Sequence, residues 1–118
     1  MKTVFQSIFY LFFGVICLAQ SIPTDSLYLG QIPPNDNPKI FKLSVTLGFF
    51  AAERIAISKD GKNIYYNEQN GYNPTSITRS KYYSYYNNKW NGPFVLFEEY
   101  GCIAFSLNDD TMFLPKRD

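Results

Sequence analysis

Residues 54–67 read RIAISKDGKNIYYN and contain the clearest structural signal in the chain. Ile and Tyr residues are concentrated in 54–58 and 63–67, as is typical of β-strands. Between them, Asp60 and Gly61 form a strong turn signal, because Gly tolerates a positive φ and an Asp side chain can hydrogen-bond to its own turn. The stretch therefore predicts a β-hairpin.

A similar pattern starts 48 residues further along the chain. Residues 103–114, IAFSLNDDTMFL, align without a gap on residues 55–66, IAISKDGKNIYY. Three positions are identical, the apolar positions stay apolar or aromatic, and both central segments contain Asn or Asp. Successive four-stranded units in β-propellers have a spacing of about 40–50 residues. The alignment therefore predicts a second hairpin at 103–114.

Two more strands are predicted between these hairpins. A loop rich in Asn, Gly and Pro occupies 68–76, a strand follows at 77–86, and residues 87–89 turn the chain. Gly92-Pro93 interrupts the pattern before a further apolar run at 94–97. With the first hairpin, these segments give four short strands.

The first nineteen residues, 1–19, have the pattern of a secretory signal peptide. Lys2 precedes an apolar core, and small residues near Ala19 predict cleavage after that position. The core at 8–19 is shorter than the about 20 residues that a membrane-spanning helix needs. Lipid attachment at Cys17 is a weaker alternative, because Ile16 stands where the modifying enzymes require a small residue.

A proline-rich segment links the signal peptide to the strands. Residues 20–48 are predicted to form an extended leader, because proline fixes φ and removes a backbone donor, so that no helix is expected there. Strand-forming repeats then occupy 49–118. The prolines of the leader are Pro23, Pro33, Pro34 and Pro38.

Composition excludes several classes of function. The chain has 11 Lys and Arg and 10 Asp and Glu residues, so loss of Lys2 leaves a balanced charge with no basic stripe for nucleic acid. It contains no histidine, which excludes Ser-His-Asp and Cys-His nucleophiles and His-ligated zinc. Cys102 is the one cysteine after the signal peptide, so no intramolecular disulfide is expected.

Three segments resemble those of a known family. Residues 57–66 resemble the F-S-P-D-G-K-x-I-Y-F core of WD40-like (PD40, TolB-type) propeller repeats, with Lys59 in place of the usual proline. Residues 88–93, NKWNGP, resemble the N-G-K-W-T-x-P turn that follows this core. Residues 28–34 and 38–41 resemble the leader before the first blade in exported Bacteroidetes-type members.

The resemblance implies an all-β fold, namely an antiparallel four-stranded propeller blade followed by the start of a second blade. Residues 108–110, Asn-Asp-Asp, depart from the Pro-Asp-Gly turn of the family. A closed ring takes about four to eight blades. The chain is therefore expected to be the N-terminal fragment of a longer propeller, through a truncated gene, a partial gene assignment or an excerpted sequence.

Aromatic residues are the most conspicuous candidates for binding. Residues 82–86, YYSYY, suggest a stacking platform for sugars or peptides, whereas strand geometry points Tyr83 and Tyr85 to one side and Tyr82 and Tyr86 to the other. Packing is the favoured interpretation of these tyrosines. Trp90, after the turn, is likewise predicted to anchor packing rather than to bind a ligand.

The acidic pairs and the cysteine are given structural roles. Glu98-Glu99 and Asp109-Asp110 match no calcium-loop spacing and are predicted to be solvated residues of a strand end and a turn. Cys102 is predicted to be a small buried hydrophobe. No catalytic, metal-binding or cofactor-binding residue is assigned, no cofactor is expected, and the ligand-binding residues remain open.

Together these features predict a non-enzymatic binding or scaffold module of the bacterial cell envelope, periplasmic or extracellular, whose partner is an envelope protein or polysaccharide. One alternative is the propeller portion of an exported, peptidase-like hydrolase, and another is a carbohydrate-binding aromatic surface. Membrane contact is expected only through the signal peptide before cleavage. Self-association is expected through an unpaired edge at 101–114, because exposed apolar edges invite strand pairing.

Overall fold

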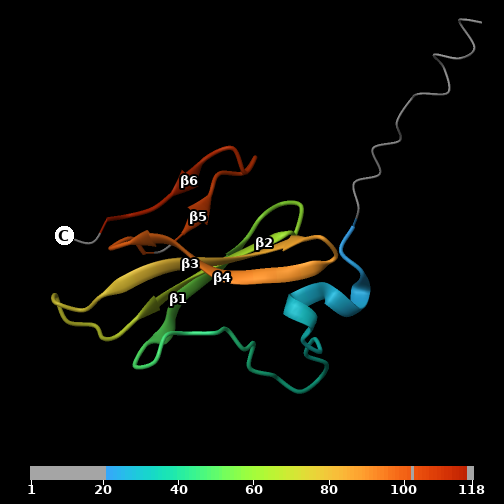
Figure 1. The fold of residues 1–118 in the computed structure, drawn as a ribbon, viewed down its shortest axis with the longest axis horizontal. Coiled ribbons are helices and arrows are strands. Elements are labelled where there is room, and N and C mark those ends of the chain that lie inside the picture. Colours follow the sequence, from blue (N-terminus) through green and yellow to red (C-terminus); the bar gives the residue numbers. More distant parts are fainter. Residues whose placement is uncertain (1–20, 102, 117–118) are drawn as a thin grey trace, which may run out of the picture.

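The protein folds as one four-stranded antiparallel sheet with a separate two-stranded hairpin (Figure 1). The structure, a computed structural model, describes residues 21–101 and 103–116. The sheet has the order β1-β2-β3-β4, and its strands are β1 (Phe50–Ile57), β2 (Asn63–Gln69), β3 (Thr78–Tyr86) and β4 (Lys89–Glu98). The prediction of an all-β fold is confirmed, and the sheet is open, with β1 and β4 at its edges.

The first hairpin forms where the sequence predicts it. Ile57 pairs with Ile64, and the Ser58 N–H donates to the Asn63 carbonyl at 3.0 Å. The turn contains Gly61 at φ +72°, a conformation that favours glycine. Its hydrogen bonds include one from the Ser58 hydroxyl to the Asp60 carboxylate at 2.6 Å.

β1 and β2 extend further than predicted, whereas β3 starts slightly later. β1 begins at Phe50 instead of residue 54, because Ala51 and Ala52 continue the pairing with β2. β2 reaches Gln69, so the following loop starts two residues later than expected. β3 begins at Thr78, one residue after the predicted start.

The prediction that Gly92-Pro93 interrupts the fourth strand is wrong. β4 runs through both residues, and a register shift between Tyr82 and Ser84 absorbs the irregularity. Proline is tolerated there because β4 is an edge strand. Gly92 has φ +117°, and a Cβ at this position would lie 2.8 Å from the Tyr82 carbonyl oxygen.

The second hairpin reproduces the first at the predicted offset of 48 residues. β5 (Ala104–Phe105) pairs with β6 (Met112–Phe113), and Phe105↔Met112 corresponds to Ile57↔Ile64. The Ser106 N–H donates to the Thr111 carbonyl at 2.9 Å, as Ser58 does to Asn63. Asp109 adopts φ +59° at the place of Gly61. The strands are only two residues long, which is shorter than the sequence alignment predicts.

The leader contains a short helix that was not expected. η1 (Thr24–Gly30) is a 3-10 helix with a kink, whose φ and ψ are non-helical at Leu27, Tyr28 and Leu29. The prediction of a wholly extended leader is wrong here because Pro23 precedes the helix and no proline lies within it. Within the described residues, no helix is long and apolar enough to cross a membrane.

The sheet lies between two other layers. The leader runs along one face, and the segment with β5 and β6 lies on the opposite side (Figure 1). Side chains alternate between these faces, so that Tyr66 and Tyr83 stack on the leader side while Tyr65 and Tyr82 stack on the hairpin side. We call these the leader face and the hairpin face of the sheet.

Candidate functional site

The leader face combines a buried charged network with an apolar groove. Strand pairing brings three residues of β2 opposite three residues of β3 on this face. The pairs are Ile64↔Tyr83, Tyr66↔Lys81 and Glu68↔Arg79. The leader makes its polar contacts with the charged and hydroxyl-bearing residues of these pairs.

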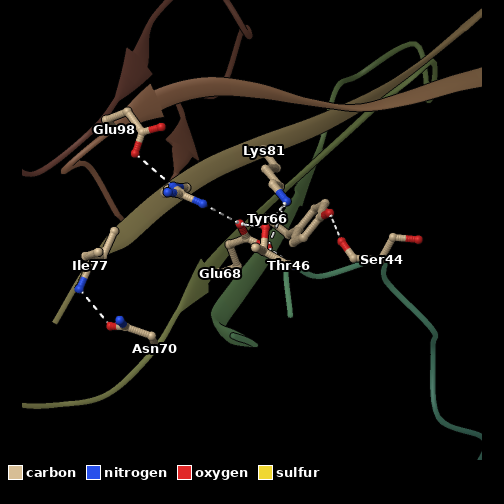
Figure 2. A network of polar contacts seen from close by, with 9 residues as sticks. Ser44, Thr46, Tyr66, Glu68, Asn70, Ile77, Lys81 and Glu98 are labelled. Atoms are coloured by element: carbon tan, nitrogen blue, oxygen red, sulfur yellow. Dashed lines mark hydrogen bonds and ion pairs between the residues drawn. The ribbon is translucent and has the colours of Figure 1, made fainter. Parts of the chain in front are cut away.

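Glu68 is the centre of the network (Figure 2). Its side chain is 0% exposed, and its carboxylate lies 2.8 Å from the Lys81 ammonium group, whose side chain is 10% exposed. The Thr46 N–H and the Thr46 hydroxyl each donate to this carboxylate at 2.7 Å. Lys81 in turn donates to the Thr46 hydroxyl oxygen at 3.0 Å. A leader residue thus completes a buried ion pair of the sheet.

The environment of Glu68 favours its ionised form. Burial by itself raises the pKa of Glu68, but hydrogen bonds from Lys81 and Thr46 outweigh it and hold the pKa below its ordinary value. A carboxylate that is ionised and fully hydrogen-bonded is poorly suited to exchange protons near neutral pH. The contacts of this network with Thr46 join the leader to the sheet.

Arg79 connects this network to the surface. Its guanidinium group lies 3.8 Å from Glu68 and 2.9 Å from Glu98, whose side chain is largely exposed. The same group lies 4.9 Å from the centre of the Phe49 ring, close enough for a cation–π contact. Arg79 therefore joins β3 both to β4 and to Phe49, the residue that precedes β1.

Hydroxyl and indole groups fix the leader at two further places. The Tyr66 hydroxyl donates to the Ser44 carbonyl, and the Ser44 N–H donates to the Tyr83 hydroxyl at 3.2 Å. Nearer the start of the leader, the Trp90 indole N–H donates to the Ser26 carbonyl at 2.6 Å. Four side chains from three strands thus bind leader backbone.

A closed loop of the leader forms one wall of the groove. The Gln31 amide donates to the Lys42 carbonyl and accepts from the Lys42 N–H, both at 2.8 Å, so that it joins the two ends of the loop. Against β1 and β2 this loop leaves an apolar hollow of about 320 Å³. The principal aliphatic residues that line it are Ile32, Ile40, Ile55, Ile57 and Ile64.

A second hollow of about 380 Å³ adjoins the first and shares Phe41 and Ile55 with it. Its other lining residues include Leu43 and Arg54. We call the two hollows together the β1 groove. The β1 groove is mainly apolar, and its lining includes one lysine and one arginine.

A larger hollow of about 720 Å³ lies where the loop before β3 meets the end of β4. Its charged lining residues are Arg79, Glu98, Glu99 and Lys116, two cations and two anions. Arg79 already pairs with Glu98. The balanced charges give no preference for an anionic or a cationic ligand. Among the described residues, no group of three or more Cys, Asp or Glu residues is placed to hold a metal ion.

The aromatic residues singled out in the sequence lie in protein contacts. Tyr82 contacts Tyr65 and Phe94 through its ring, and Tyr83 stacks on Tyr66. The Tyr85 and Trp90 rings meet edge to face, with 5.4 Å between their centres. These contacts agree with a packing role, while a sugar-binding surface stays a prediction.

The predicted acidic residues do not form one site. Glu99 is exposed, and Asp110 accepts a hydrogen bond from the Ser106 hydroxyl within its own turn. Asp109 is half-buried and accepts from the Lys59 N–H, so that it links the turns of the two hairpins. Cys102 lies outside the described residues.

The residues that organise the site were not recognised from the sequence. The sequence pattern predicts Glu68 in a loop and Lys81 in a strand, and it assigns a partner to neither. The available signal was the alternation of β2, which puts Glu68 on the same face as Tyr66, but nothing local shows that the leader returns to cover that face. No protein-family model matches the chain, and neither a curated protein nor a solved structure matches it.

Proposed function

We propose that this chain is a non-enzymatic binding module of the bacterial cell envelope that holds an apolar ligand in the β1 groove. The observation that carries the proposal is the groove itself, which is aliphatic and partly open. Ile55 and Ile57 are 43% and 50% exposed, although both lie within a strand. Contiguous exposed apolar surface commonly marks an interaction site.

Location and architecture belong to the same proposal. The signal-peptide pattern at 1–19 supports export to the periplasm or the exterior. The chain has an antiparallel four-stranded sheet, and the register of its first hairpin recurs 48 residues later in the second hairpin. This recurrence supports a first propeller blade of the TolB type and the start of a second. Such a blade would present the leader as part of its binding surface.

The absence of an enzyme activity is proposed on chemical grounds. The chain has no histidine, and its most buried carboxylate is saturated by Lys81 and Thr46. A general acid or base needs a pKa near the working pH, whereas the pKa of Glu68 is lowered. Turnover of a peptide or glycoside substrate by the purified protein would contradict this part of the proposal.

The binding function can be tested with 8-anilinonaphthalene-1-sulfonate, a dye that is both apolar and anionic. We expect saturable binding at one site, and we expect Ile57→Asp to weaken it by about tenfold because a carboxylate in the groove is costly to desolvate. Leu107→Asp is the control, since Leu107 is also an exposed aliphatic side chain, 97% exposed against 50% for Ile57, but lies on the turn of the second hairpin. Binding that is unsaturable, or equal in both variants, would refute the groove as the ligand site.

A further inference from the structure

We propose that the ligand of the β1 groove is an extended peptide segment of a partner protein, which joins the free edge of β1 as an additional strand and places a carboxylate near Lys39 or Arg54. The inference rests on the proposed function and names its ligand class. In strand addition, main-chain hydrogen bonds supply affinity, and pockets for alternate side chains supply selectivity. The groove offers both a free strand edge for main-chain hydrogen bonds and hollows for side chains.

The free edge of β1 offers backbone groups at the groove. In an antiparallel pair, successive residues direct their N–H and C=O groups alternately toward and away from the partner strand. Ser58 directs its N–H to Asn63 of the neighbouring strand, and Ile57 pairs with Ile64. Ile55 and Ile57 therefore direct their backbone groups away from β2. Among the described residues, neither one makes a backbone hydrogen bond outside the sheet.

The other edges are less suitable for strand addition. β4 contains Pro93, which has no N–H, and it has two register shifts against β3. β5 and β6 are only two residues long. β1 has eight residues without Gly or Pro. Its one irregularity, between Ala52 and Ile55, lies beside the second hollow and leaves the pairing regular from Ile55 to Ile57.

The arrangement of the groove suits alternate side chains of a strand. Same-face side chains of an extended chain are about 6.5–7 Å apart. The two hollows adjoin through Phe41 and Ile55, so neighbouring same-face residues of the added strand have a hollow each. Aliphatic side chains match the lining of the first hollow, which is formed chiefly by isoleucine and proline.

The positive charges beside the groove indicate that the partner segment carries a carboxylate. Lys39 lines one hollow and Arg54 the other, and the described side chains that line the two hollows include no Asp or Glu. The ion pairs of the described residues involve Arg79 and Lys81 only. Among the side chains that the structure describes, Lys39 and Arg54 thus have no internal counterion, and both line the β1 groove. A partner strand with aliphatic residues and a flanking carboxylate complements both properties.

The probe for this inference is the peptide acetyl-EITVTIE-amide, compared with acetyl-KITVTIK-amide by fluorescence anisotropy on the purified protein. We expect the acidic peptide to bind and the basic one to bind about tenfold more weakly, because only the former complements Lys39 and Arg54. Arg54→Glu should narrow or reverse this preference. Lys89→Glu, the same charge change at an exposed position on the far edge strand, should leave it unaltered. Equal binding of the two peptides would overturn the charge assignment.

Strand addition itself is tested with the acidic peptide N-methylated at alternate residues, which keeps every side chain and removes the backbone donors. We expect one of the two methylation patterns to weaken binding at least about tenfold and the other to have little effect, because only one edge of the added strand faces β1. Equal affinity for both patterns and the unmethylated peptide would overturn strand addition. Dye binding without peptide binding would refute this inference and leave the groove function intact, whereas loss of dye binding would refute the proposed function itself.

Discussion

Asn67 and Glu68 are neighbours on β2 and lie on opposite faces of the sheet. Both are buried, but they differ in whether their polar groups have hydrogen-bonding or ionic partners. Glu68, on the leader face, carries a charge and has ionic or hydrogen-bonding partners in Lys81, Arg79 and Thr46. Asn67, on the hairpin face, is neutral and only 1% exposed, and within the described part of the chain both atoms of its amide group lack a hydrogen-bond partner. The cost of burying a polar group depends on its partners more than on its charge.

The same contrast extends to the layers that cover each face. The leader is joined to the sheet through Ser26, Ser44 and Thr46. The C-terminal segment is joined by the Ser80 hydroxyl, which donates to the Tyr100 carbonyl at 2.7 Å, by the Lys59 N–H, which donates to Asp109, and by the Phe105 ring against Tyr65. On that side the Gln69 Nε2 also has no partner among the described residues. We infer that the leader is an integral layer and that the second hairpin is held less firmly.

The largest effect is expected from Glu68→Gln, which disrupts the buried network of the leader face. The substitution keeps the shape of the side chain but leaves the buried Lys81 ammonium without its counterion. Breaking a buried ion pair in this way costs about 3–5 kcal/mol of the free energy of unfolding. Urea denaturation followed by tryptophan fluorescence measures the loss, since Trp90 is the only tryptophan.

Glu98→Gln is the matched control for this experiment. Glu98 contacts the same arginine as Glu68, but its side chain is 58% exposed, and exposed pairs contribute no more than about 1 kcal/mol. A loss for Glu68→Gln that is no greater than the loss for Glu98→Gln would show that the buried network does not hold the leader.

Asn67→Leu should change stability in the opposite direction. Leucine is close to asparagine in shape and removes two buried polar atoms that lack partners. A gain of about 1–2 kcal/mol in the free energy of unfolding is therefore expected, again from urea denaturation. A loss of similar size would mean that the Asn67 amide does have a partner, and the contrast between the faces would fail.

Trp90→Phe tests the second attachment of the leader, at Ser26. The variant keeps an aromatic ring against Tyr85 but loses the indole donor, so a loss of about 1 kcal/mol is expected in thermal or urea unfolding followed by circular dichroism. Tyr86→Phe, at an exposed ring on the same hairpin, is the control and should have no measurable effect. Equal losses would remove the argument that Trp90 fixes the leader.

The smallest effect is expected on lowering the pH from 7 to about 5.5. The chain has no histidine, and the folded-state pKa values of Glu68 and Asp60 lie below their ordinary values of 4.5 and 3.8. A lowered pKa adds stability that is complete above the ordinary value and is lost as the pH falls through the folded value. Stability should thus be flat in this range and decline below it, and the decline should be shallower in Glu68→Gln. A fall in stability between pH 7 and 5.5 would contradict the assignment.

The sequence allowed prediction of those features that depend on neighbouring residues. The Asp60-Gly61 turn, the alternation of Tyr82 and Tyr83 between faces, and the equivalence of the two hairpins at 48 residues all follow from local geometry. The turns form the same backbone hydrogen bonds even though Asp109 replaces Gly61, because Asp also tolerates a left-handed backbone.

Features that depend on distant segments escaped prediction. Thr46 reaches Glu68 and Ser26 reaches Trp90 only because the leader folds back over the sheet. No periodicity in a proline-rich segment encodes such a return, so the buried network and the β1 groove became visible only in the structure. Strand length also depends on distant segments. β1 and β2 are long because β3 and β4 extend the same sheet, whereas the described residues contain no third strand beside β5 and β6.

The most direct test of the account is amide hydrogen exchange at Thr46, measured by NMR in the wild-type protein and in Glu68→Gln. The account predicts that the Thr46 amide is protected in the wild type, because it donates to a fully buried carboxylate, and that Glu68→Gln abolishes this protection while Tyr65 and Tyr82 stay protected in the sheet. Exchange of the Thr46 amide at the rate of an open chain in the wild type would contradict the claim that the leader is an integral layer of the fold.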